Sequence, residues 1–150
     1  MWGTQTLYCA QVLDLTNNGM SSTLPPAWGL PGAFPRLGSL LLDINHLTGE
    51  LPPEWGSADG FPALQSLSLV YNKVTGRLPD AWGADGSFPE LQSLALGANQ
   101  LTGALPAAWG SASGLANLQV RNALISAALS GCKVTCCQPL SATAWAELPL

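Results

Sequence analysis

Charged side chains are scarce in this sequence, at 9% of 150 residues. Five bases and nine acids give a formal net charge of −4, and the bases are scattered along the chain. Because a phosphate backbone requires a concentrated basic surface, we expect no nucleic-acid partner. The hydrophobic share of 47% is well above that of a disordered chain and is enough to form a core.

Long apolar runs are also missing. No stretch approaches the roughly 18 apolar residues of a membrane-spanning helix, so we expect no span within this chain. Residues 1–4 have neither the basic segment nor the apolar core of a signal peptide. Cysteine occurs only as Cys9, Cys132, Cys136 and Cys137, which does not describe a disulfide scaffold. The C-x3-CC spacing lacks the four well-spaced ligands typical of zinc, so we expect no metal.

The sequence does contain a repeat with a period of 27 residues. An asparagine, a Leu-Pro pair and a Trp-Gly pair return in register four times. The columns are Asn18, Asn45, Asn72 and Asn99; Leu24, Leu51, Leu78 and Leu105; and Trp28, Trp55, Trp82 and Trp109. Because a unit this small cannot bury its own apolar face, the repeat predicts stacked coils that share one core.

Each copy predicts three parts. Leucines at alternate positions, as in residues 67–69, predict a short strand that pairs in parallel with its neighbours, about 4.8 Å apart. The asparagine opens a turn. The remainder is rich in proline and glycine, which excludes a long helix and favours single-turn or extended pieces. Bulky tryptophan and phenylalanine on that side would bend the stack, so that the strands line its concave surface.

Two columns suggest specific structural roles. A buried asparagine amide must find partners, and in a stack it can bond backbone groups of its own turn and of the next coil. We therefore expect a structural asparagine ladder at the four positions named above. Gly49, Gly76 and Gly103 are expected at backbone conformations or close approaches that a side chain would disturb. We interpret the tryptophan column as core packing rather than a sugar-binding strip.

The pattern LxxLxLxxNxLTGxLPxxWG, clearest at residues 64–83 and 91–110, resembles the plant-type leucine-rich repeat. The resemblance implies an α/β solenoid, a right-handed coil with a concave parallel β-sheet and a convex side of short helical or extended segments. In that family the LTGxLP segment often adds a second small sheet. The copies are 27 residues long where the common plant repeat has about 24, and tryptophan replaces the usual leucine before glycine.

The repeats divide the chain into three parts. Residues 1–10 are interpreted as the remnant of a preceding repeat, 11–118 as four copies, and 119–150 as a degenerate repeat or C-terminal cap with a loose tail. The chain is therefore interpreted as a fragment of a longer array. Family members often carry cysteine-stabilised caps, so Cys132, Cys136 and Cys137 could form a disulfide or remain free thiols.

The resemblance also implies a function. Receptor-like proteins and polygalacturonase inhibitors of this class bind proteins, peptides or glycans, mostly at the cell surface or outside the cell. We therefore expect a non-catalytic binding module that needs no cofactor. Two alternatives remain: an intracellular scaffold, for example in a cytoskeletal or axonemal assembly in the cytoplasm, and an inhibitor of a cell-wall-degrading enzyme.

Candidate binding residues lie between and after the strand leucines. His46 near Asp43 could suggest a general base, but no nucleophile accompanies the pair, so we expect a non-catalytic histidine. The threonines of the LTG segments are interpreted as ordinary repeat residues rather than an ice-binding array. Solenoids bind extended partners on their concave face. The predicted binding residues there are Asp43, His46, Ser66, Ser68, Val70, Tyr71, Lys73, Ser93 and Gln100.

Overall fold

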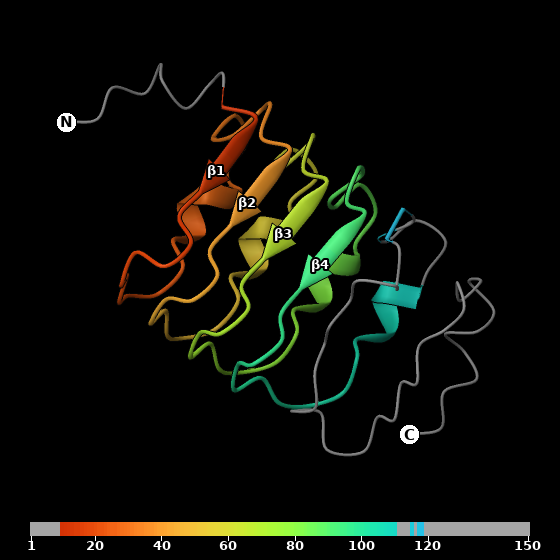
Figure 1. The fold of residues 1–150 in the computed structure, drawn as a ribbon. Coiled ribbons are helices and arrows are strands. Elements are labelled where there is room, and N and C mark those ends of the chain that lie inside the picture. The colour runs from red at the N-terminus through yellow and green to blue at the C-terminus, as the bar shows by residue number, and fades with distance from the viewer. Residues whose placement is uncertain (1–9, 111–114, 116, 119–150) are drawn as a thin grey trace.

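The computed structural model describes residues 10–110, 115, 117 and 118, and they form a stack of similar coils (Figure 1). We number the coils one to four by their asparagines, Asn18, Asn45, Asn72 and Asn99. The strands are β1 (Val12–Asp14), β2 (Ser39–Leu41), β3 (Ser66–Ser68) and β4 (Ser93–Ala95). The 3-10 helices are η2 (Pro26–Gly29), η3 (Pro53–Gly56), η4 (Asp80–Gly83) and η5 (Ala107–Gly110).

The strands form one parallel sheet in the order β1-β2-β3-β4, and each strand pairs only with its neighbours in sequence. Ser39 is opposite Ser66, and Ser66 is opposite Ser93, so the sheet register equals the sequence period. The middle residues of β2, β3 and β4 are the leucines Leu40, Leu67 and Leu94, all fully buried. The predicted leucine-rich repeat solenoid with a parallel sheet is therefore confirmed.

The opposite side of the stack is built from 3-10 turns that cover two columns of aromatic rings. Prolines at the start of η2 and η3 suit the first turn of a helix, where a backbone N–H has no partner to lose. Trp55 and Trp82 stack with ring centroids 6.2 Å apart and planes 3° from parallel. Phe88 meets Trp82 edge-on at 5.3 Å. Ring stacking between coils and edge contacts within a coil thus tie this side together.

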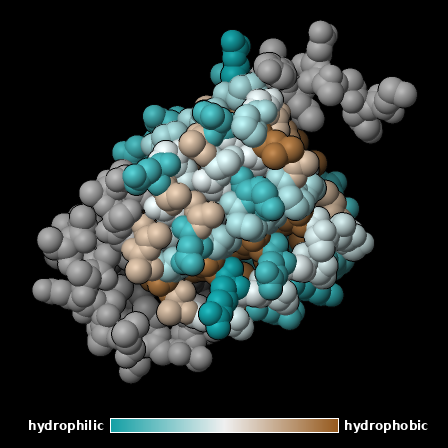
Figure 2. Space-filling view, turned by 180° about the vertical axis from the view of Figure 1, so that it is seen from behind, coloured by the Kyte–Doolittle hydropathy of each residue, from teal (hydrophilic) through white to brown (hydrophobic). Residues whose placement is uncertain are grey.

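The tryptophans are core residues. The side chains of Trp55 and Trp82 are fully buried, and the indole Nε1 of Trp82 donates to the Pro52 carbonyl of the preceding coil at 2.9 Å. Seen from behind the strands, the molecular surface is mostly hydrophilic to neutral, with hydrophobic atoms showing between polar ones (Figure 2). The interpretation of this column as core packing is therefore confirmed.

The LTGxLP segments add a rudimentary second pairing between coils. Isolated parallel bridges join Thr23 to Thr48 and Glu50 to Thr75. The Thr75 hydroxyl donates to the Gly49 carbonyl of the preceding coil at 3.2 Å. Gly76, with φ of +80°, has the left-handed conformation that glycine tolerates best. The hydroxyls of this column therefore serve bonds between coils.

The asparagine side chains join successive coils at the strand exits. In the third coil, Asn72 Nδ2 lies 2.9 Å from the Leu42 carbonyl and 3.1 Å from the Leu69 carbonyl, and its Oδ1 accepts the Leu47 N–H at 3.1 Å. Leu42 and Leu47 belong to the preceding coil. The expectation of bonds to the next coil is therefore wrong in direction, because the Leu42 carbonyl and the Leu47 N–H of the preceding coil face this side chain.

Replacing Asn72 with alanine should destabilise the stack by about 3 kcal/mol, because the Leu47 N–H would lose its acceptor and the Leu42 and Leu69 carbonyls would each lose one of two amide donors. Asn18 provides the matched control. It is exposed, and within residues 10–110 its Nδ2 donates to Thr16 of its own turn, so Asn18→Ala should cost less than about 1 kcal/mol. Urea unfolding followed by circular dichroism measures both. Equal losses would show that the bonds between coils contribute little.

Candidate functional site

The concave face carries the outward-pointing residues of the short strands. Alternation along each strand buries the central leucine and turns its neighbours outward. Ser39, Ser66 and Ser93 form one register-matched row across β2, β3 and β4, and all three are partly exposed. The next outward row contains Ser68, which is buried with 9% of its surface exposed. The serines make their part of the face shallow. Val12, beside Ser39 and 60% exposed, and the half-buried Leu41, beside Ser68, are the larger side chains of the two rows.

Asp43 is occupied by contacts within the protein. Its Oδ1 accepts the Ser68 hydroxyl at 2.5 Å and the Val70 backbone N–H at 2.6 Å, and both donors belong to the following coil. Within the described residues, no hydrogen bond joins Asp43 to His46. The structure thus brings three predicted site residues together, Asp43, Ser68 and Val70, as one bonded group at the end of β3.

The first coil offers a comparison. Its Asp14 accepts the Thr16 N–H at 3.0 Å, within the same strand exit. Hydrogen bonds from the Thr16 side chain and backbone lower the pKa of the exposed Asp14 carboxyl below its ordinary value. Thr16 occupies the repeat position of Val70. The N–H at this repeat position is therefore capped by an aspartate in two coils. Asp14 caps Thr16 within its own coil, whereas Asp43 caps Val70 of the following coil.

Tyr71 follows Val70 and is the most exposed large apolar side chain in the described part, at 65%. Its φ is +57°, in the left-handed region. Ile44, at the equivalent position of the preceding coil, has φ of +54° and is 52% exposed. The Ile44 N–H donates to the Val70 carbonyl at 2.8 Å, so the backbones that carry the two side chains run side by side.

Ile44 is a residue that the sequence interpretation missed. It occupies the same repeat position as Tyr71, so the argument that selected Tyr71 applies equally to it. Left-handed backbone is strongly disfavoured for a β-branched residue and persists only where the surroundings enforce it. The sequence indicated this residue, because Ile44 is a large apolar residue at a position outside the buried leucine columns.

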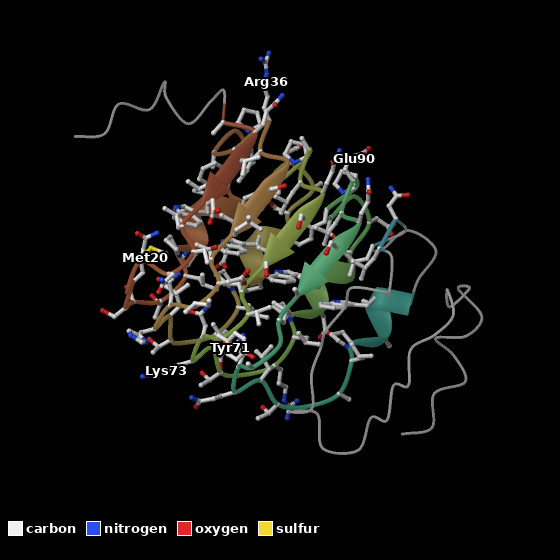
Figure 3. All side chains as sticks on the ribbon, viewed as in Figure 1. Met20, Arg36, Tyr71, Lys73 and Glu90 are labelled. Carbon is white, nitrogen blue, oxygen red and sulfur yellow. The ribbon has the colours of Figure 1, made fainter. Side chains whose placement is uncertain are left out.

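His46, Lys73 and Gln100 occupy one repeat position at the strand exits, and all three are exposed. Their backbone N–H groups each donate to the preceding coil, for example Lys73 to the Leu47 carbonyl at 2.9 Å. Lys73 and Tyr71 extend from the side where the strands end, while Arg36 and Glu90 lie on the side where the strands begin (Figure 3). We name the strand-exit surface by its residues Ile44, His46, Tyr71 and Lys73.

The described residues contain no group of three or more histidine, cysteine, aspartate or glutamate side chains arranged to hold a metal. Across the same residues, no helix has the length and apolar character needed to cross a membrane. Cys9, Cys132, Cys136 and Cys137 lie outside the described part, so the predicted cap and its disulfide stay predictions. The same holds for the boundaries proposed at residues 1–10 and 119–150.

A solenoid of parallel strands, asparagine-bridged turns and LTGxLP segments defines a leucine-rich repeat protein. The fold of this chain is of that class, and the family model described as Leucine Rich Repeat matches residues 9–30. Its repeats are of the plant type and are similar to those of plant receptor ectodomains of known structure. No curated protein matches the chain significantly.

Three similar solved structures are the following, two of them described as plant receptors. PEPR1–AtPEP1 is 40% identical, with a TM-score of 0.60, and the match covers 72% of this chain and 14% of that one. The peptide hormone receptor RGFR1 in complex with RGF2 is 31% identical, with a TM-score of 0.61 and coverage of 73% and 16%. The ectodomain of the Arabidopsis thaliana receptor kinase GASSHO1/SCHENGEN3, in complex with CASPARIAN STRIP INTEGRITY FACTOR 2, is 31% identical, with a TM-score of 0.60 and coverage of 73% and 12%.

The chain thus spans about one seventh of the length of these proteins.

Proposed function

We propose that this chain is a non-catalytic recognition module that binds a peptide or protein segment with its strand-exit surface. The observation that carries the proposal is the pair Ile44 and Tyr71. Two large apolar side chains are exposed on neighbouring coils, just after the C-terminal ends of β2 and β3. Burial by a partner would remove their surface from water. Tyrosine is also among the residues that most often dominate binding energy.

The chemistry of the surface suggests the kind of segment that it would accept. An apolar side chain of the partner would cover Ile44 and Tyr71. An acidic group nearby would meet the Lys73 ammonium, which is exposed and extends from the same edge. The serine rows alongside are shallow enough for an extended backbone to approach the sheet. Asp43 is engaged inside the protein and is not assigned to ligand contact.

The similar structures support this proposal. RGFR1 and GASSHO1/SCHENGEN3 are complexes with RGF2 and CASPARIAN STRIP INTEGRITY FACTOR 2 respectively, and the former is described as a peptide hormone receptor. By this analogy we place the chain in a longer protein at the cell surface or outside the cell, acting by binding and not by catalysis.

Substituting Tyr71 with asparagine should abolish most binding and leave folding intact. Asparagine tolerates left-handed backbone better than tyrosine does, and the first coil has Asn17 at this position with φ of +55°. A displayed library of random linear peptides, selected on the immobilised chain, supplies the probe. We expect Tyr71→Asn to weaken the selected peptides about 30-fold, as for an interface residue that dominates binding.

Leu30 provides the control. It is an exposed apolar residue directly after η2, on the other side of the stack, and 53% of it is exposed. Leu30→Ser should therefore leave peptide affinity unchanged. Selected peptides that bind Tyr71→Asn as tightly as the unaltered chain would exclude this surface as the site. A library that yields no binder would count against linear peptides as partners.

A further inference from the structure

Asp43 connects two coils at the base of the strand-exit surface. One of its two carboxylate oxygens, Oδ1, accepts both the Ser68 hydroxyl at 2.5 Å and the Val70 N–H at 2.6 Å. A carboxylate at this repeat position is unique to the second coil, since the other coils have Thr16, Val70 and Gly97 there. Bonds to a charged acceptor are shorter and stronger than neutral ones. The junction of the second and third coils therefore has a clamp that the other junctions lack.

The Asp43 clamp is bonded to Val70, the residue immediately before Tyr71. Its donor Val70 also receives the Ile44 N–H on its carbonyl at 2.8 Å, and the Tyr71 N–H donates to Gly97 at 3.1 Å. The peptide groups before and after Val70 are thus hydrogen-bonded to both neighbouring coils. Left-handed backbone is unfavourable for a large side chain and persists only when the surroundings determine it. Ile44 and Ala98 share this conformation, although the coil before each of them has no carboxylate at the repeat position of Asp43. The repeat turn therefore sets φ, and the clamp adds one further bond at Val70.

We propose that Asp43 is a positioning residue: its carboxylate holds Val70 so that Tyr71 is presented to a partner in a fixed conformation. The proposal rests on the proposed function of the strand-exit surface. A side chain that is already ordered loses less conformational freedom on binding, so the clamp raises affinity without touching the partner. Asp43 therefore contributes to recognition by positioning Tyr71, and not by contacting the ligand as the sequence predicts.

Asp14 and the isosteric amide provide the controls. Asp14 caps the Thr16 N–H in the first coil at 3.0 Å but reaches no other coil. Asp14→Ala should therefore loosen Thr16 and leave Val70 and Tyr71 as they are. Asp43→Asn keeps an oxygen acceptor of the same shape for Ser68 and Val70, whereas Asp43→Ala removes it.

The experiment combines amide hydrogen exchange in the free chain with peptide affinity. In Asp43→Ala we expect the Val70 amide to exchange about 10-fold faster, because its bonded partner is gone. We expect the peptides selected on the unaltered chain to bind about 10-fold more weakly to the same variant. Asp43→Asn should restore both properties to within about threefold, since its side-chain oxygen can still accept the two bonds.

Two results would overturn the proposal. Faster Val70 exchange with unchanged affinity would make the clamp purely structural. Weaker binding in both Asp43→Ala and Asp43→Asn, with Val70 exchange unchanged, would make Asp43 a direct contact with the partner. If Asp43→Ala does not fold, Asp43→Val takes its place, because it removes the acceptor with the residue that the third coil has at this repeat position. Unchanged affinity in Tyr71→Asn would instead reject the proposed function, whatever Val70 exchange shows.

Discussion

Replacing Gly56 with alanine is expected to destabilise the solenoid by about 3 kcal/mol or more, although it adds only one methyl group. A Cβ atom there would lie 2.6 Å from the Ala81 carbonyl carbon and 2.8 Å from the Trp82 nitrogen. Both atoms belong to the backbone of η4, which cannot rotate out of the way as a side chain could. The third coil would have to move away from the second. Urea unfolding monitored by circular dichroism gives the change in unfolding free energy.

Gly38 is the matched control for this substitution. An added Cβ would be 3.4 Å from the nearest atom, the Gln11 carbonyl oxygen, and the equivalent positions of other coils already hold Gln65 and Gln92. Gly38→Ala should therefore change the stability by less than about 1 kcal/mol. A Gly56→Ala variant as stable as Gly38→Ala would mean that the 3-10 turns of neighbouring coils are not in contact.

Trp82→Ala is the second substitution with a large expected effect, at about 4 kcal/mol. Trp82 is fully buried and stacks between Trp55 and Trp109, with both centroid distances 6.2 Å. Its loss would leave a cavity in the middle of the aromatic column. The Pro52 carbonyl would also lose the indole N–H at 2.9 Å and keep only the Trp55 N–H at 3.2 Å. The measurement is the same urea titration.

Trp28 tests whether the central position matters. It is only half-buried and stacks on Trp55 alone among the tryptophans of the described coils, at 6.0 Å. Trp28→Ala should cost about half as much as Trp82→Ala, because burial and ring contacts both fall. Similar losses at the two positions would show that stability depends on the tryptophan count and not on stacking between coils.

The two glycine columns show where sequence reasoning stopped. The sequence predicts a backbone role for Gly49, Gly76 and Gly103, and their φ values between +76° and +87° confirm it. It assigns no role to the glycine after each tryptophan. Gly56 has an ordinary φ, so no conformational argument identifies it; only the distance to the next coil does. Such a distance is not encoded in any one copy of the repeat.

The candidate site shows the same limit. The sequence places Asp43 and Tyr71 together at the concave edge as residues of one kind. The structure separates them, because Asp43 is bonded to Ser68 and Val70 while Tyr71 is exposed. The spacings from Asp43 to its donors are 25 and 27 residues. A bond across nearly one repeat depends on side-chain direction, which a repeat spacing leaves open.

The sequence alone determined the coil, its period, the parallel register and the identity of the core columns. It could do so because equivalent residues in a stack must lie beside one another, whatever the details of each coil. Only the tertiary structure decided which polar side chains are occupied, that Ile44 joins Tyr71 as an exposed pair, and which glycines admit no Cβ. Those properties follow from the few ångströms between adjacent coils, and packing sets that separation only once the coils are stacked.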